Sequence, residues 1–137
     1  MTAKQLSLTA LALVIGVASW VACGETLQPT TEQTLTVSIV SPGGTDGAAH
    51  FRLTGPGFID VKAAATGEVV YWRLQSDNQV EVLLFGNITS GASLTIRVPD
   101  AGQANRYAGV LVEVADRNND LQDISGYSVT ISRTAVD

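Results

Sequence analysis

The sequence predicts an all-β protein, an antiparallel β-sandwich of about eight short strands preceded by a hydrophobic N-terminal segment. From Leu35 onward apolar and polar residues alternate with a period of two, which is typical of strands with one buried face. Gly, Pro, Asp and Asn interrupt these alternations at near-regular intervals, as turns do between short strands. No segment after Leu35 sustains the 3.6-residue apolar period of a helix, so we expect almost no helix there.

The N-terminal segment from Leu6 to Ala22 carries no charge and follows the basic Lys4. A positive start, an apolar middle and small residues near the exit are typical of a secretory signal. The alternative is a retained membrane helix with Trp20 as its interfacial anchor, which would reach about 26 Å, slightly short of a ~30 Å hydrocarbon core. Both readings place the remainder outside the cytoplasm, because Lys4 should stay inside.

The only cysteine, Cys23, follows directly on this apolar segment. The stretch Trp20 to Gly24 resembles the lipobox of bacterial lipoproteins, in which a small residue precedes a cysteine that is lipidated and becomes the new N-terminus. This resemblance implies lipidation of Cys23 and a place on the bacterial cell envelope, with the domain facing the periplasm or the exterior. Without lipidation, a lone exported cysteine would be a free thiol or an intermolecular disulfide.

The chain thus divides into a signal or anchor (1–22), a Thr-, Gln- and Glu-rich tether (23–34), a sandwich (35–133) and a short tail (134–137). The net charge of the whole chain is −5, and loss of Lys4 with the signal makes it more negative. A surface of this sign repels phosphate backbones and anionic headgroups, which excludes nucleic acid and electrostatic membrane docking. The membrane partner is therefore reached through the N-terminal lipid or helix.

Each predicted strand is an alternation of three apolar residues. The eight alternations run from Leu35 to Ile39, Ala49 to Leu53, Ile59 to Ala63, Val70 to Leu74, Val80 to Leu84, Leu94 to Val98, Val110 to Val114 and Tyr127 to Ile131. Breaks such as Ser41-Pro42-Gly43-Gly44 and Gly55-Pro56-Gly57 separate them.

The fourth and fifth strands form a hairpin whose register the sequence predicts. With Ser76-Asp77-Asn78 as the loop, Gln75 faces Gln79, and the alternation from Val70 to Leu74 faces the one from Val80 to Leu84 on a single core-facing side. The same register sets Arg73 against Glu81 on the other side, a favourable opposite-charge pair.

That other side of the hairpin also carries Val69, Tyr71, Leu83 and Phe85, which is more apolar than a solvated face needs. Either loops or a neighbouring strand cover these residues, or they form an exposed patch that meets a partner. They are our candidate partner-binding residues.

Three stretches carry a family resemblance: Asp46 to Leu53, Asn87 to Val98, and Val112 to Asp116 leading to the segment 126–131. The region from about Thr36 to Arg133 thereby resembles a shortened cohesin-type domain, a bacterial extracellular sandwich that holds proteins together. The resemblance implies a jelly-roll or immunoglobulin-like sandwich with an interaction role, and no dockerin partner is carried over.

Oxygen side chains at Asp116, Asn118 and Asp120 have the opening spacing of an EF-type calcium loop. Leu121 replaces the glycine that turns such a loop, and Tyr127 stands where the bidentate carboxylate belongs. A plain solvated loop is the favoured interpretation, with calcium as the weak alternative and no other cofactor expected.

Catalytic chemistry has little support in the sequence. His50, the only histidine, lies on an alternating strand without evident companions, which favours a surface role over that of a catalytic base. A sugar-stacking platform of Tyr71, Trp72, Phe58 and Tyr107 is a minor alternative to packing. We therefore predict a non-enzymatic envelope lipoprotein that binds an extracytoplasmic protein or glycan; the alternative is an accessory subunit of a membrane complex, held by an uncleaved helix.

Overall fold

The computed structural model describes residues 33–135 as eight strands and one short 3₁₀ helix. The elements in chain order are β1 (Gln33–Val40), β2 (Asp46–Thr54), β3 (Asp60–Ala63), β4 (Val69–Ser76), β5 (Gln79–Ile88), β6 (Gly91–Val98), η1 (Ala101–Arg106), β7 (Ala108–Asp116) and β8 (Ser128–Arg133). Among these residues no helix has the length and apolarity needed to cross a membrane.

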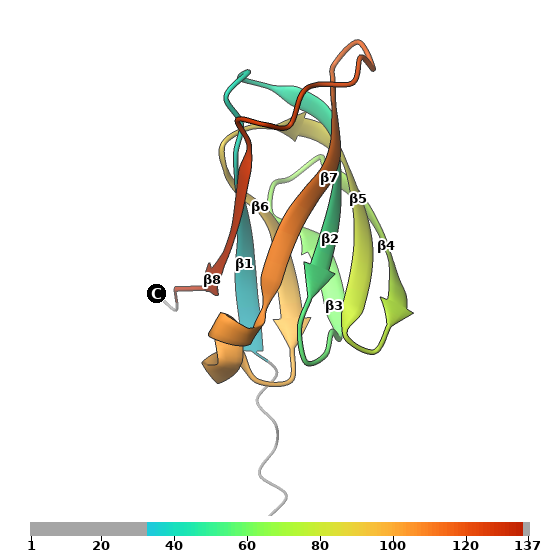
Figure 1. The fold of residues 1–137 in the computed structure, drawn as a ribbon. Coiled ribbons are helices and arrows are strands. Elements are labelled where there is room, and N and C mark those ends of the chain that lie inside the picture. The colour runs from blue at the N-terminus through green and yellow to red at the C-terminus, as the bar shows by residue number, and fades with distance from the viewer. Residues whose placement is uncertain (1–32, 136–137) are drawn as a thin grey trace, which may run out of the picture.

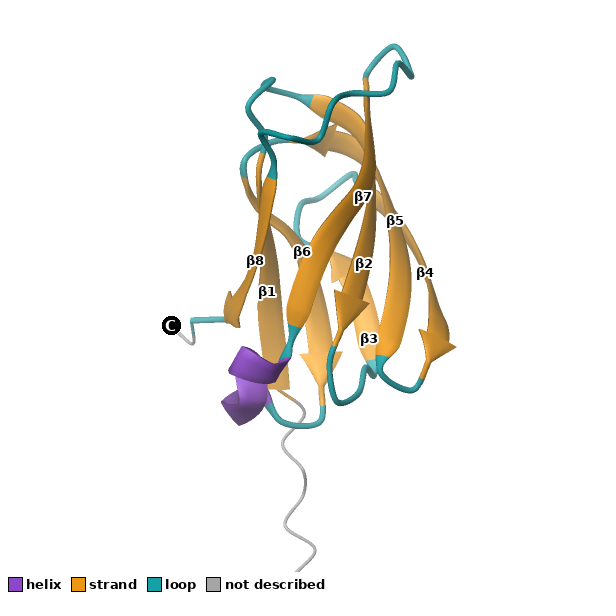
Figure 2. Ribbon diagram, viewed as in Figure 1, coloured by secondary structure: helices purple, strands orange, loops and turns teal. Residues whose placement is uncertain are grey.

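The strands form two four-stranded sheets, ordered β3-β6-β1-β8 and β4-β5-β2-β7, and every pairing is antiparallel. The sheets lie face to face with the chain crossing repeatedly between them, and η1 sits at one end (Figures 1 and 2). The predicted all-β class with antiparallel strands is confirmed.

The core lies between the sheets and is made by the inward-facing half of each alternation. Its fully buried side chains include Leu35, Val37 and Ile39 of β1, Phe51 and Leu53 of β2, Val80, Val82 and Leu84 of β5, and Leu94, Ile96 and Val98 of β6. Burial of each large aliphatic side chain is worth about 1.5–3 kcal/mol. The alternation with a period of two therefore brings the apolar side chains of each strand to the buried face, as an apolar stripe does in an amphipathic helix.

The β4–β5 hairpin has the predicted register from Val69 opposite Phe85 to Leu74 opposite Val80. The turn is shorter than predicted, because the register shifts after Leu74 and Ser76 pairs with Gln79. Leu74 was expected in the core but is 52% exposed. The reason is its position on an edge strand, next to this shift and two residues before the end of β4.

β7 departs from the predicted alternation in its first half. Val110 is 55% exposed, whereas Leu111 packs against the core and Val114 is buried. The register between β2 and β7 shifts between His50 and Phe51, which leaves Val112 as the extra residue of a bulge. A bulge moves the alternation by one residue, so the two halves of the strand bury opposite parities.

The buried acidic side chain of the described region, Asp46, ties together three chain segments. Its Oδ2 accepts a hydrogen bond from the Ser41 hydroxyl at 2.8 Å, and its Oδ1 accepts one from the Tyr127 hydroxyl at 3.0 Å. Burial is the main cause that raises the pKa of Tyr127, and the bond to Asp46 adds to it. These contacts join the residue that follows β1 and the residue that precedes β8 to the start of β2.

The predicted signal or anchor (1–22), Cys23 and most of the predicted tether (23–34) lie outside the described residues. The final two tether residues, Gln33 and Thr34, are strand residues instead, since β1 begins at Gln33. Gln33 pairs with Val98, and its side-chain oxygen accepts a hydrogen bond from the Ala101 backbone N–H. Because of these bonds to β6 and η1, the domain begins at Gln33, two residues before Leu35.

Candidate binding face

The candidate site is the outer face of the β4-β5-β2-β7 sheet, the side turned away from the other sheet. Side chains alternate along each strand, so the residues between the core positions point to this face. Pairing across the strands arranges them in transverse rows. One row holds Tyr71, Leu83, His50 and Glu113, and the next holds Arg73, Glu81, Arg52 and Val110.

One end of the outer face presents an apolar patch of Val69, Tyr71, Leu83 and Phe85. Their exposed fractions are 50%, 63%, 42% and 41%, so no loop or strand of the described region covers them. Tyr71 and Phe85 meet edge to face, with ring centroids 6.2 Å apart. The expectation that these residues share a face is met, and they are exposed in residues 33–135. Their contact with a partner stays a prediction.

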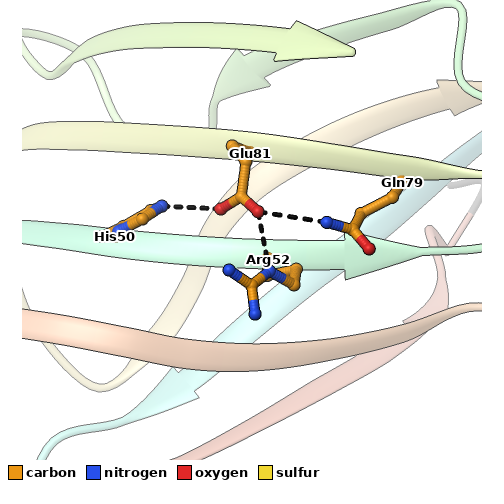
Figure 3. Close-up of polar contacts among 4 residues, drawn as sticks. All are labelled: His50, Arg52, Gln79 and Glu81. Atoms are coloured by element: carbon orange, nitrogen blue, oxygen red, sulfur yellow. Dashed lines mark hydrogen bonds and ion pairs between the residues drawn. The ribbon is translucent and has the colours of Figure 1, made fainter. Parts of the chain in front are cut away.

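Beside the apolar patch lies an ion-pair cluster centred on Glu81 (Figure 3). Glu81 Oε1 lies 2.6 Å from Arg52 Nε, and Glu81 Oε2 lies 2.7 Å from His50 Nε2. Gln79 Nε2 donates a longer bond of 3.2 Å to the same Oε1. The cluster bridges β2 and β5 and fixes the orientation of all four side chains.

The contacts of Glu81 shift the pKa of its carboxyl group. The hydrogen bond from Arg52 is the largest influence on the pKa of Glu81 and lowers it. Partial burial acts in the opposite direction, and the bond from His50 lowers the pKa further. The Glu81 carboxylate is thus favoured in its charged form and holds Arg52 and His50 in place.

Arg73 was expected to pair with Glu81 and does not. The two residues are opposite each other in the hairpin, as predicted, but Glu81 turns its carboxylate toward Arg52 on the next strand. Within residues 33–135 the Arg73 side chain forms no ion pair. It remains available to a ligand or a partner.

Two residues of the patch and the whole cluster border an open concavity of about 550 Å³. Tyr71 and Leu83 supply apolar surface, while Arg73, Gln75 and Glu81 supply hydrogen-bonding groups. A surface of this composition can bind through both apolar contact and directional polar bonds. The concavity lies on the sheet itself, so its floor is held by backbone pairing.

The predicted calcium loop is closed by its own hydrogen bonds. Asp116 Oδ1 accepts bonds from the backbone N–H groups of Asn118 at 2.8 Å and Asp120 at 3.0 Å, and Asn119 adopts a positive φ of 67°. In the described part of the chain, no group of three or more His, Cys, Asp or Glu side chains is placed to hold a metal ion. Calcium binding by this loop stays the weaker, untested alternative to a plain solvated loop.

The four aromatic residues considered for sugar stacking do not come together. Tyr107 is buried, donates its hydroxyl to the Gly57 carbonyl and packs edge to face on Phe58. Trp72 packs against the core on the inner side of β4. Only Tyr71 lies on the outer face, so that platform is wrong as an assembly of all four.

Sequence reasoning missed the Glu81 cluster and treated His50 as an isolated surface residue. His50 and Arg52 have the same parity on β2, which is visible in the sequence, but their pairing with β5 is not. β2 and β5 are neighbours in the sheet without being neighbours in the chain. No local signal in either strand specifies that contact.

Comparison of the chain with protein-family models, curated proteins and solved structures finds no match.

Proposed function

We propose that this chain is a non-enzymatic binding module of the bacterial cell envelope, whose outer face contacts an extracytoplasmic protein or glycan. The observation that carries the proposal is the apolar patch, four large side chains that are each at least 41% exposed. Contiguous exposed apolar residues rimmed by polar groups are typical of interaction sites. In this proposal Cys23 carries the lipid anchor and the fold is a sandwich of the cohesin type.

The composition of the outer face supports binding. Tyr and Arg are enriched among residues that dominate binding energies, and Tyr71 and Arg73 lie two positions apart on β4. The neighbouring Glu81 cluster is already ordered, so its polar groups lose little freedom when a partner arrives. His50 contacts a carboxylate held by Arg52, which favours an orienting role over that of a catalytic base.

The position of the patch also supports a role away from the membrane. The β4–β5 turn lies at the same end of the molecule as η1 and the start of β1 (Figure 1). Val69 and Phe85 form the hairpin pair farthest from that turn. An anchor that precedes Gln33 would therefore place the apolar patch toward the end of the domain that lies away from the membrane.

The test uses the full chain with a C-terminal tag, purified from gently solubilised native membranes. We expect Leu83→Lys to lose the protein or glycan companions of the wild type while its Tm stays unchanged, because Leu83 lies outside the core. Val40→Lys is the matched control, since Val40 is a similarly exposed apolar residue of the other sheet. Retention of every companion by Leu83→Lys would refute the proposed site.

The intact mass of the same sample tests the anchor. We expect a mass that begins at an acylated Cys23. A mass that begins at Met1, together with stoichiometric membrane proteins, would instead favour the accessory subunit with an uncleaved helix.

A further inference from the structure

The four sheet edges of the described domain differ in how they are protected. β3 is only four residues long and carries the Asp60–Lys62 ion pair. β7 and β8 close against each other, since a Cβ added at Gly109 of β7 would lie 2.8 Å from Val129 Cγ1 of β8. Short strands, charges and covered edges are the devices by which proteins prevent strand pairing between molecules.

β4 has fewer of these devices, since Arg73 is its only charged side chain and β3 approaches it without pairing. It is an eight-residue edge strand without Lys, Pro or Gly, and its register with β5 is regular from Val69 to Leu74. No other strand of the described region pairs with its second side, and it lies at the side of the molecule away from β8 (Figure 1). A long, regular and largely apolar edge of this kind is a template for another strand.

The sequence of β4 is complementary to itself in the antiparallel direction. Two copies related by a two-fold axis at Trp72 place Tyr71 opposite Arg73 of the other copy, twice. They also place Val70 opposite Leu74, twice. Each Arg73, which forms no ion pair within residues 33–135, thereby meets an exposed aromatic ring, a favourable cation–π contact.

Other registers match less well. Opposite residues of an antiparallel pair must point to the same face, so the register can change only in steps that preserve parity. One such step sets Arg73 against Arg73, which places like charges together. The step in the other direction sets Glu68 against Leu74. Only the register centred at Trp72 pairs each of Val70, Trp72 and Leu74 with an apolar residue on the inner side.

The exposure of Leu74 fits the same arrangement. It has the parity of the core residues, yet it is 52% exposed at the end of β4. Val70 and Trp72 share this parity and are only partly buried. A second β4 strand would cover all three residues on its inner side.

We propose that two copies of this chain associate through antiparallel pairing of their β4 strands about a two-fold axis at Trp72. The β4-β5-β2-β7 sheets of the two copies then form one eight-stranded sheet, and the two apolar patches lie on the same side of it. This inference goes beyond the proposed function, because it concerns the strand edge rather than the outer face. It also doubles the surface that a partner can contact.

The test is the mass of the full chain in detergent, measured by sedimentation velocity over a range of concentrations. We expect the wild type to reach two chains, and Leu74→Asp to raise the dimer dissociation constant at least about tenfold with an unchanged Tm. Val110→Asp is the matched control, since Val110 is 55% exposed on β7, the opposite edge of the same sheet. This control should stay dimeric.

A wild type that remains a single chain at every concentration would overturn the proposal, as would a Leu74→Asp variant that is still dimeric. Leu83→Lys separates the two proposals, because it should lose the companions of the outer face and keep the dimer. Loss of the dimer alone would leave the proposed function standing.

Disulfide mapping tests the register independently of these variants. Chains with Tyr71→Cys and chains with Arg73→Cys are mixed and oxidised, and linked peptides are identified by mass spectrometry. We expect a disulfide that joins position 71 of one copy to position 73 of the other, distinguished by its peptides from any link through Cys23. Val110→Cys should give no such link with itself, and a predominant 71–71 link would overturn the register centred at Trp72.

Discussion

Two adjacent leucines of β5 have opposite environments: Leu84 is fully buried between the sheets, whereas Leu83 is 42% exposed on the outer face. Leu84 alternates with Val80 and Val82, whereas Leu83 has one apolar neighbour on its own face of the strand, Phe85. The period of two decides which residues share a face, but not which face a second sheet covers. Apolar residues on one face of a strand are therefore not by themselves evidence that this face lies in the core.

Carboxyl groups show the same contrast between inside and outside. Asp46 is 3% exposed and is bound by the hydroxyls of Ser41 and Tyr127. Glu81 lies on the outer face and is bound by Arg52 and His50. The hydroxyl hydrogen bonds of the buried Asp46 connect separate chain segments. The ion pairs of Glu81 instead orient side chains on the outer face of the sheet.

Truncation of the two leucines should give the largest difference. We expect Leu84→Ala to lower the free energy of unfolding by about 2–5 kcal/mol, because it leaves a cavity in the core. Leu83→Ala should lower it by under about 1 kcal/mol, because its site is already in water. Urea denaturation of both variants checks this, and equal losses would show that the outer face is covered in the native protein.

Removal of the Tyr127 hydroxyl should have an intermediate effect. We expect Tyr127→Phe to cost about 1–2 kcal/mol, since Asp46 loses one of its two hydroxyl donors in a buried place. Tyr71→Phe is the matched control on the exposed outer face and should be close to neutral. Thermal unfolding monitors both. If the two variants unfold alike, the buried bond adds no more than a solvated hydroxyl does.

The ion-pair cluster should contribute least, and only where Glu81 is charged. At neutral pH, Glu81→Gln should cost about 0.2–1 kcal/mol. The lowered pKa of Glu81 means that the unfolded chain takes up the proton first as the pH falls. The stability difference should therefore be constant above about pH 4.3, the ordinary range of Glu, and shrink as the pH falls toward the lowered pKa.

Urea denaturation at several acid pH values measures this profile, and a double-mutant cycle with Arg52→Gln isolates the pair. A wild-type profile that runs parallel to that of Glu81→Gln through the acid range would contradict the assigned cause.

Local sequence was sufficient where both partners are close in the chain. The pairing of Tyr71 with Leu83 and of Trp72 with Val82 follows from one turn and one alternation, and the structure has both. It was insufficient for the bulge at Val112, because nothing in Ala108–Asp116 marks the residue at which the alternation changes parity. The helix η1 was missed because its six residues are too few to show a period.

The sequence likewise predicted only part of the candidate site. Exposure of the apolar patch was one of two alternatives that the sequence left open, since it depends on what other segments cover. The contact of Arg52 with Glu81 was not foreseen, because β2 and β5 meet only when the sheet assembles. Arg73 is closer to Glu81 in the sequence, but Glu81 forms its ion pair with Arg52 of β2, which the folded sheet places next to it.

The sequence by itself determined the strand class, the alternation of faces and the hairpin register, because these depend on the pleat of a single strand and on one tight turn. The tertiary structure alone decided the strand order, the burial of Leu84 beside the exposure of Leu83, and the ionic partners of Glu81. The physical reason is that side-chain direction is local, whereas burial and pairing depend on which segments the folded chain brings together.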